Sequence, residues 1–419
     1  MATRGEHLLR GGKLFASGSG LVGRMFARSF ARVLDAIDQR LEVGGIEATT
    51  PEGEVRRLGF RAPGPECIVH LKSWYALVRL ATSGSIGWYR AWAKGEWTSP
   101  DPVPLFALFT ANARSLGDTA RSKGAARLLN LFKHRRRDND TVGARENIAA
   151  HYDLGNDFYA AWLDPTMSYS SARFASDSES LEQAQRRKVK LLLDRLDLKP
   201  GQRLLEIGCG WGSLATEAAK RGVSVVGLTL SSEQKKWADK RSLKAGLFDK
   251  VEIRLADYRD VAEQFDAIAS VEMVEAVGER WWGAYLDCIA RNLKPGGKAA
   301  LQYISIEHDL FESYARNPDF IQAYIFPGGM LLDEPRFEAL AKERGLSWDD
   351  RDGFGLDYAR TLKIWRENYD AAVASGELQG FSADFHNLWR YYLMYCEGGF
   401  RGAAIDVAQI TLKAGTPRP

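Results

Sequence analysis

The sequence predicts an α/β protein whose larger, C-terminal part is a doubly wound, mostly parallel sheet. Two observations predict it: short apolar runs alternate with helical segments from residue 147 onward, and a glycine-rich turn follows the first run. Strands and helices that alternate at this spacing form a parallel sheet with helices on both faces. The expected strands are 203–207, 223–228, 251–255, 265–271 and 298–304, with later β runs near 346–350 and 404–412 at the sheet edge.

A smaller α+β domain is expected ahead of this sheet, over residues 1–116. Residues 8–36 carry apolar side chains at helical spacing, with arginines such as Arg24 and Arg28 between them. This pattern is typical of a helix packed on its own domain, and an interfacial helix attracted to anionic lipid is the alternative. Short runs at 46–49 and 67–71 predict strands, and 73–82 predicts a helix followed by another. With Gly87, Tyr89 and Lys94-Gly95-Glu96-Trp97, the stretch resembles a sterol-carrier-like lipid module, and an oligomerisation domain fits it about equally well.

Residues 117–145 are interpreted as a basic linker, which leaves 146–419 for the large domain. The run from Lys133 to Arg137 has no apolar period and is followed by Asp138. Such a run is usually solvated, although each basic side chain near an anionic leaflet would add about 1 kcal/mol. The net charge of the chain is only +3 and no recognition fold is visible, so nucleic acid is not expected as a partner.

The cysteines and the apolar runs predict a cytoplasmic protein. The chain has 419 residues, and its four cysteines are far apart with no CxxC pair, so they are interpreted as reduced thiols without a metal site. No apolar run is long enough to span a bilayer, and arginines interrupt the early apolar stretch, so no secretory signal is expected.

The glycine-rich turn is the first candidate for a binding site. The run 204–207 leads into Gly208, Gly210 and Gly212, and a helical pattern follows. Such a turn lets the backbone approach a phosphate or the amino-acid end of S-adenosylmethionine (SAM). An NAD site would place an acidic residue about 20 residues further on, and Thr229 and Gln234 stand there instead. This argues against NAD.

Several motifs, in order along 147–413, resemble the cyclopropane-fatty-acid synthase family. They are His151–Tyr159, Leu163-Asp164-Pro165 with Met167-Ser168-Tyr169-Ser170, Glu206–Gly212, Val226–Thr229 with Ser232-Glu233-Gln234, Asp257–Asp260, Asn292–Gly297, Phe326–Gly329, Phe354–Tyr358, and Tyr391–Leu393 with Cys396. The resemblance implies a class I SAM-dependent methyltransferase fold. It also implies a reaction that methylates the double bond of unsaturated phospholipid acyl chains.

The resemblance also implies which residues bind SAM. Tyr169 and Ser170 would cover the carboxylate and sulfonium region. Glu206 and the three glycines belong to the turn that would hold the methionine part. Thr229 and Gln234 would face the ribose, and Asp257 and Tyr258 would flank the adenine. For the glycines, turn geometry alone is a sufficient explanation, and for Tyr169 and Tyr258 core packing is the alternative.

Methyl transfer to an alkene leaves a carbocation, from which a base must remove a proton. Aromatic faces such as those of Tyr358, Phe326 and Tyr303 are candidates to stabilise this cation. In the family the base is a bicarbonate ion held by a Cys, a Glu, a His, a backbone group and a Tyr. The resemblance assigns three of these positions to Glu275, Ile304 and Tyr358.

Four positions of the base site depart from the family pattern. Ser171 stands at the Cys position, Gln302 at the His position, Ala276 at another usual His, and Glu272 at a usual small residue. Two carboxylates at one site would repel bicarbonate and raise one pKa, so the hypothesis is that a side chain is the base. The alternative is that Glu272 is turned away and bicarbonate still binds.

The sequence therefore predicts a cytoplasmic SAM-dependent methyltransferase that is peripheral on the inner face of the membrane. One alternative is a relative that methylates without ring closure and gives a methylene, methyl-branched or diene-methylated chain, with a reductase as a further partner. Another is a non-catalytic lipid-binding protein, and a third is a small-molecule methyltransferase. Cys396 aligns with a cysteine assigned as the family's nucleophile, although direct transfer from SAM needs no covalent enzyme intermediate. A homodimer is a further option.

Overall fold

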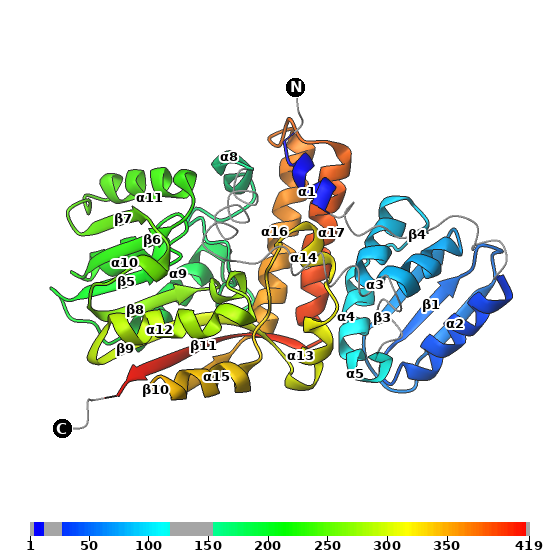
Figure 1. Cartoon of the computed structure of the whole chain (residues 1–419). Helices are drawn as coiled ribbons and strands as arrows, with labels where there is room; N and C mark the ends of the chain where they lie inside the picture. Colours follow the sequence, from blue (N-terminus) through cyan, green and yellow to red (C-terminus); the bar gives the residue numbers. More distant parts are fainter. Residues whose placement is uncertain (1–3, 12–26, 118–153, 416–419) are drawn as a thin grey trace. The chain divides into compact units, whose positions relative to one another are not determined.

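The computed structural model describes residues 4–11, 27–117 and 154–415, which form two compact units (Figure 1). The first unit is Met1–Arg137, Glu307–Pro327 and Gln379–Ile405, and the second is Asp138–Ile306, Gly328–Leu378 and Asp406–Pro419. The first unit thus includes two segments from the C-terminal half of the chain. The basic linker predicted at 117–145 (apart from Gly117), the first three residues of the His151–Tyr159 motif and residues 12–26 of the basic stretch 8–36 lie outside the described residues.

The first unit contains a four-stranded sheet with strand order β2-β1-β3-β4. The strands are β1 (Gly45–Thr49), β2 (Val55–Gly59), β3 (Glu66–Leu71) and β4 (Trp97–Thr98). The strands expected at 46–49 and 67–71 are present as β1 and β3, which pair in parallel. Strand β2 was not expected, because its exposed Val55 and its two arginines break the apolar alternation that identifies a half-buried strand.

Helices make up the rest of the first unit. They are α1 (Glu6–Gly11), α2 (Ala27–Arg40), α3 (Tyr75–Ala93), α4 (Val103–Ala111), α5 (Ala113–Leu116), α13 (His308–Ala315), α14 (Phe320–Tyr324) and α17 (Ala383–Arg401). The two helices expected from residue 73 onward form one element, α3, which is kinked at Gly84 (φ 57°, ψ −139°). The two C-terminal segments join this unit through aromatic packing. The ring of Tyr89 lies 4.9 Å from that of Phe320 and 5.0 Å from that of Tyr391.

The second unit is built on a seven-stranded sheet with strand order β10-β11-β9-β8-β5-β6-β7. The strands are β5 (Arg203–Ile207), β6 (Ser224–Thr229), β7 (Val251–Leu255), β8 (Phe265–Val271), β9 (Leu293–Ile306), β10 (Leu346–Gly353) and β11 (Ile405–Ala414). The pairs β5/β6, β5/β8, β6/β7 and β8/β9 are parallel, and β10/β11 is antiparallel. The expected mostly parallel α/β sheet is therefore confirmed, with the two late β runs at its edge.

Helices connect these strands and enclose the core (Figure 1). They are α8 (Asn156–Ala160), α9 (Leu181–Arg195), α10 (Ser213–Lys220), α11 (Ser232–Lys244), α12 (Trp282–Asn292), α15 (Glu334–Glu343) and α16 (Gly355–Ser375), with short 3₁₀ turns η4 (Tyr258–Asp260), η5 (Val274–Ala276) and η6 (Glu279–Trp281). The capping box expected at Ser180 and Gln183 begins α9. Leu192 of α9 packs in the same core as Leu204 and Val225 of the sheet.

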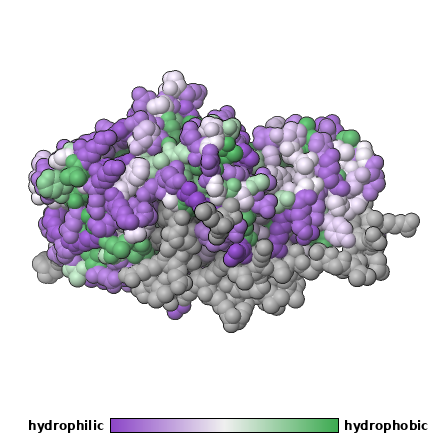
Figure 2. Space-filling model, turned by 90° about the horizontal axis from the view of Figure 1, so that it is seen from above, coloured by the Kyte–Doolittle hydropathy of each residue, from purple (hydrophilic) through white to green (hydrophobic). Residues whose placement is uncertain are grey.

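Figure 2 shows a surface on which hydrophilic residues predominate and hydrophobic residues gather only in small areas. Across the described ranges, no helix is both long and apolar enough to cross a bilayer.

Candidate active site

Glu272 and Gln302 meet at the carboxyl-end edge of the parallel sheet, where ligands bind in folds of this kind. Glu272 directly follows β8, and Gln302 lies in the neighbouring strand β9. Glu272 has φ 46°, a left-handed conformation that costs a non-glycine residue roughly 1–2 kcal/mol. Its backbone N–H donates to the carbonyl of Gln302 at 2.7 Å. The fold therefore holds this residue in a strained conformation, as proteins often do at functional sites.

Three donors converge on the carboxylate of Glu272, a half-buried residue. The backbone N–H of Ser171 (2.9 Å) and Nε2 of Gln302 (2.7 Å) donate to Oε1, and the hydroxyl of Tyr358 (2.7 Å) donates to Oε2. Burial raises the pKa of Glu272, while nearby Lys188 and the three hydrogen bonds lower it. The donors come from three distant parts of the sequence, and all favour the ionised form of this carboxylate.

A second buried carboxylate, Glu275 in η5, lies close to Glu272. Its Oε1 accepts a hydrogen bond from the backbone N–H of Ile304, and its Oε2 has no hydrogen-bond partner among the described residues. Burial, and then repulsion from Glu272, raise the pKa of Glu275 to about 8. Repulsion between the two groups therefore favours the protonated form of Glu275, while the three donors favour the ionised form of Glu272.

The buried side chain of Lys188 supplies a positive charge that interacts with Glu272. It lies on α9, and its Nζ donates to the hydroxyl of Ser170 at 2.6 Å. Burial lowers the pKa of Lys188 to about 8, and attraction to Glu272, Asp164 and Glu206 opposes this shift. A buried cation that faces carboxylates balances their charge, and removing one such partner leaves the others uncompensated.

We therefore expect Lys188→Met to lower the free energy of unfolding by about 3–5 kcal/mol, because buried carboxylates lose their positive neighbour. Lys190→Met is the matched control on the same helix. The side chain of Lys190 is 68% exposed and pairs with Asp194, so its loss should cost at most about 1 kcal/mol. Urea unfolding of both variants measures the difference. A cost of Lys188→Met no larger than that of the control would contradict the charge-balancing role.

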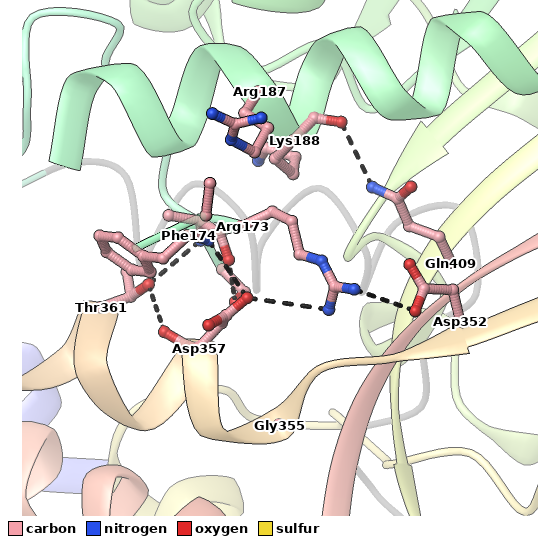
Figure 3. A network of polar contacts seen from close by, with 12 residues as sticks. Arg173, Phe174, Arg187, Lys188, Asp352, Gly355, Asp357, Thr361 and Gln409 are labelled. Atoms are coloured by element: carbon pink, nitrogen blue, oxygen red, sulfur yellow. Dashed lines mark hydrogen bonds and ion pairs between the residues drawn. The ribbon is translucent and has the colours of Figure 1, made fainter. Parts of the chain in front are cut away.

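The segment that carries Ser170 and Ser171 is fixed by α16 (Figure 3). The backbone N–H of Ala172 donates to Oγ1 of Thr361 (3.1 Å), and that of Phe174 donates to Oδ2 of Asp357 (3.2 Å). The intervening Arg173 pairs with Asp352 at 3.1 Å, and with Asp357 at 3.7 Å. These contacts fix the backbone that directly follows Ser171, whose N–H donates to Glu272.

The glycine-rich turn after β5 is open to a ligand at one position. Gly208, Gly210 and Gly212 all have positive φ (80°, 51° and 77°). A β carbon on Gly208 would lie 2.7 Å from Cγ of Met273, whereas one on Gly210 would meet nothing within 4 Å. Glu206, at the end of β5, is buried, and its Oε2 has no hydrogen-bond partner in the described part of the chain. Burial raises its pKa to about 8.

The other predicted SAM residues follow β6 and β7 at the same edge of the sheet. Thr229 donates from its hydroxyl to Oε1 of Gln234 at 2.8 Å, and both are buried. Asp257 is buried, and Arg259 binds both of its carboxylate oxygens. Tyr258 is partly buried, and desolvation raises its pKa.

Tyr169 lies in an aromatic cluster of the second unit. Its ring centre is 5.4 Å from that of Trp365 and 5.6 Å from that of Trp162. Trp365 in turn lies 6.1 Å from the ring of Tyr358, which hydrogen-bonds Glu272. Packed aromatic rings therefore connect Tyr169, which is predicted to cover the sulfonium, with Tyr358, which hydrogen-bonds Glu272.

Comparison with known proteins identifies the family. Residues 139–410 match the model of the mycolic acid cyclopropane synthetase family, which is well over half of the chain. The chain belongs to this family.

Two relatives are about equally similar to this chain in sequence. The chain is 38% identical over 349 residues to the tuberculostearic acid methyltransferase UfaA1 of Mycobacterium tuberculosis, covering 81% of each chain. It is 39% identical over 347 residues to the cyclopropane-fatty-acyl-phospholipid synthase of Escherichia coli, covering 80% of this chain and 85% of that one. Among solved structures, the mycolic acid cyclopropane synthase CmaA1 complexed with SAH and CTAB is 32% identical. It has a TM-score of 0.61, covering 64% of this chain and 98% of that one.

As a member of this family, the chain is a SAM-dependent fatty acid methyltransferase. Its glycine-rich turn fits the cofactor. A bound amino-acid group would occupy the open space at Gly210. It would also hydrogen-bond Oε2 of Glu206, which has no partner among the described residues. Glu206, the glycines, and Thr229 with Gln234 would hold SAM. When bound, SAM supplies an electrophilic methyl group on a sulfonium. The roles of the individual residues stay predictions.

Bicarbonate does not fit the synthetase-family site of this chain. The groups that would hold it are already engaged by side chains: Ser171 N–H, Gln302 and Tyr358 by Glu272, and Ile304 N–H by Glu275. The hydroxyl of Ser171 donates to the neighbouring carbonyl of Ala172 instead of facing the site. The alternative, in which Glu272 is turned away and bicarbonate binds in its place, is not observed, because Ser171, Gln302 and Tyr358 all hydrogen-bond Glu272.

Three of the sequence-based candidates lie elsewhere. Cys396 belongs to α17 in the first unit, whereas the predicted SAM-binding residues and the other predicted base-site residues belong to the second. Burial raises the pKa of its thiol, which disfavours a nucleophilic role. Tyr303 is buried and donates its hydroxyl to Glu334, and Phe326 is also part of the first unit.

Sequence reasoning missed Lys188, Trp365 and Gln409. A signal existed for Lys188, because it falls within the apolar stripe of α9 between Ala184 and Val189, where a solvated lysine is not expected. Trp365 and Gln409 carry no comparable signal, because each is an uncharged residue whose burial is compatible with an ordinary core position.

Proposed function

We propose that this protein transfers a methyl group from SAM to the double bond of an unsaturated phospholipid acyl chain, with the carboxylate of Glu272 as the base. The observation that carries the proposal is the convergence of Ser171, Gln302 and Tyr358 on Glu272. A carboxylate presents the same planar pair of oxygens as bicarbonate, so donors suited to one suit the other.

The reaction balances with the groups at hand. The alkene π pair attacks the methyl carbon, and the carbon–sulfur bond breaks with its electron pair staying on sulfur. The resulting carbocation on the chain is stabilised by aromatic faces such as those of Tyr169 and Trp365. Glu272 then takes a proton from the new methyl group, and the freed C–H electron pair closes a cyclopropane ring. Glu272 ends protonated and returns its proton to water.

A second product class is methylation without ring closure. The chain is about as similar to a relative named as a tuberculostearic acid methyltransferase as to one named as a cyclopropane synthase. In this case a hydride first moves from the methyl-bearing carbon to the neighbouring cationic carbon. Glu272 then takes a proton from the methyl group, and the freed C–H electron pair forms a double bond to the methyl-bearing carbon, which gives a methylene. A methyl branch would further require a reductase partner that supplies hydride.

A phospholipid bilayer surface is the substrate partner that this proposal requires, on the model of the E. coli relative, whose name specifies a fatty-acyl phospholipid. A peripheral position on the inner face of the membrane and a homodimer both remain predictions. Bicarbonate is not part of the proposal.

Incubation of the purified full chain with ¹³C-methyl SAM and vesicles of unsaturated phosphatidylglycerol tests the function. We expect label in the acyl chains, and a mass gain of one CH₂ per modified chain. Proton NMR separates ring methylene signals from those of an exocyclic methylene. Vesicles with saturated chains are the control. Absence of SAM consumption on unsaturated vesicles would overturn the enzyme proposal in favour of a lipid-binding protein.

A further inference from the structure

Gln409 lies next to the base site, and no role has been assigned to it so far. It is a buried residue of β11. Its Nε2 donates to Oε1 of Gln302 at 3.0 Å and to the backbone carbonyl of Lys188 at 3.3 Å. The second of these contacts is drawn in Figure 3. Gln409 thus connects α9 to the strand that carries Gln302.

The contact decides which end of the Gln302 amide faces Glu272. An amide has a donor end and an acceptor end. Because Gln409 occupies the acceptor end, the NH₂ end of Gln302 faces Oε1 of Glu272 (2.7 Å) and the carbonyl of Ser171 (3.3 Å). In the opposite orientation, the Gln302 oxygen would face two acceptors and its NH₂ group would face that of Gln409.

We infer that Gln409 is a positioning residue for the base: it fixes the Gln302 amide so that a hydrogen-bond donor always faces the carboxylate of Glu272. This inference rests on the proposed function, in which the ionised form of Glu272 removes the proton. A histidine at the Gln302 position could change its charge and tautomer, whereas an amide held from behind presents one neutral donor at every pH.

The groups that face Glu272 come from four other elements and from the segment that precedes α9. They are Lys188 on α9, Ser171 on the preceding segment, Gln302 on β9, Tyr358 on α16 and Glu275 in η5. Of the three hydrogen-bond donors to Glu272, only Gln302 is held by Gln409. The other contact of Gln409 is to the backbone carbonyl of Lys188 and not to its charged side chain, so a change at Gln409 should reach Glu272 chiefly through the Gln302 amide. That route can be isolated by mutation.

The test compares Gln409→Met with wild type in single-turnover assays on unsaturated vesicles across pH. Methionine keeps the length of the side chain and removes the donor, so Gln302 is free to reverse. The ionised form of Glu272 then loses a hydrogen bond, and the acid limb of the rate profile should move up by about one pH unit. At pH values on the acid limb, the rate of Gln409→Met should be about tenfold lower than that of wild type. The KM for SAM should not change.

Two further variants isolate the route. Gln302→Met moves the acid limb itself, and adding Gln409→Met to it should produce no further shift, because the two residues act as one unit. Thr411→Val is the matched control, two residues along the same strand. Thr411 is buried, and its hydroxyl has no hydrogen-bond partner among the described residues, so the profile should stay unchanged.

A stability measurement separates this inference from the catalytic proposal. A raised folded-state pKa makes stability fall as pH rises through it. The melting temperature of Gln409→Met should therefore lie further below wild type at alkaline than at acid pH, and a Glu272→Gln background should abolish this pH dependence. A merely structural role lowers the melting temperature equally at both.

If the stability difference varies with pH but the rate profile does not move, Gln409 positions Gln302 and Glu272 is not the base. If the stability difference is the same at both pH values, or persists in the Glu272→Gln background, the inference about Gln409 is overturned whatever the activity does.

Discussion

Replacing Glu272 by glutamine is expected to slow product formation by about 10²–10⁴-fold, the usual contribution of a general base. Glutamine has nearly the same shape as glutamate, and its amide oxygen can still accept hydrogen bonds from Ser171 and Gln302. It has no comparable basicity, so the carbocation would form without a group to take its proton. SAM binding should be retained, because the glycine-rich turn is untouched.

The rate is measured with labelled SAM on unsaturated vesicles, in buffer freed of carbon dioxide and in buffer with added bicarbonate. Wild type should be equally active in both buffers. Glu279→Gln is the matched control, since Glu279 is a nearby side chain, 42% exposed, that pairs with Arg336. Full activity of Glu272→Gln together with strict bicarbonate dependence would show that the bound ion, and not the side chain, is the base.

Glu272→Gly is expected to convert the protein into a bicarbonate-dependent enzyme. Without the side chain, the N–H of Ser171, the amide of Gln302 and the hydroxyl of Tyr358 lose their common acceptor and surround a space of carboxylate size. Bicarbonate would satisfy these donors and restore the base. Glycine also suits φ 46°, so the backbone conformation is kept without strain.

Activity of Glu272→Gly should be near zero in bicarbonate-free buffer and should rise with bicarbonate to a plateau. Combining it with Tyr358→Phe removes one of the three donors and should raise the bicarbonate concentration needed for half of the recovery. A glycine variant that binds SAM, folds normally and stays inactive at every bicarbonate concentration would contradict the idea that bicarbonate can replace the carboxylate of Glu272.

The fold was largely predictable because its signals are local. The strands of the large sheet appear as apolar runs between helical segments, and the glycines after β5 identify the turn. Strand β2 was not predictable in this way, since Arg56 and Arg57 disrupt its apolar pattern. Nor could periodicity show that 307–327 and 379–405 join the first unit, because that depends on long-range aromatic packing around Tyr89.

The candidate site was predictable as a set of positions but not as an arrangement. Ser171, Glu272, Gln302 and Tyr358 could be named in advance from motifs. That three of them bind the fourth depends on contacts between distant residues, such as the 131 residues that separate Ser171 from Gln302. The buried side chains behind them, such as Lys188, become visible only in the folded chain.

The hydrogen bonds to Glu272 have a consequence for the conditions under which such an enzyme can work. A base that is covalently part of the chain has no dissociation constant, so every folded molecule carries it. An enzyme that borrows its base from solution is only as active as its occupancy allows, and its rate follows the supply of dissolved inorganic carbon. With Glu272 as the proposed base, lipid methylation would be independent of the carbon dioxide tension, and the supply of SAM and of unsaturated chains would limit its rate.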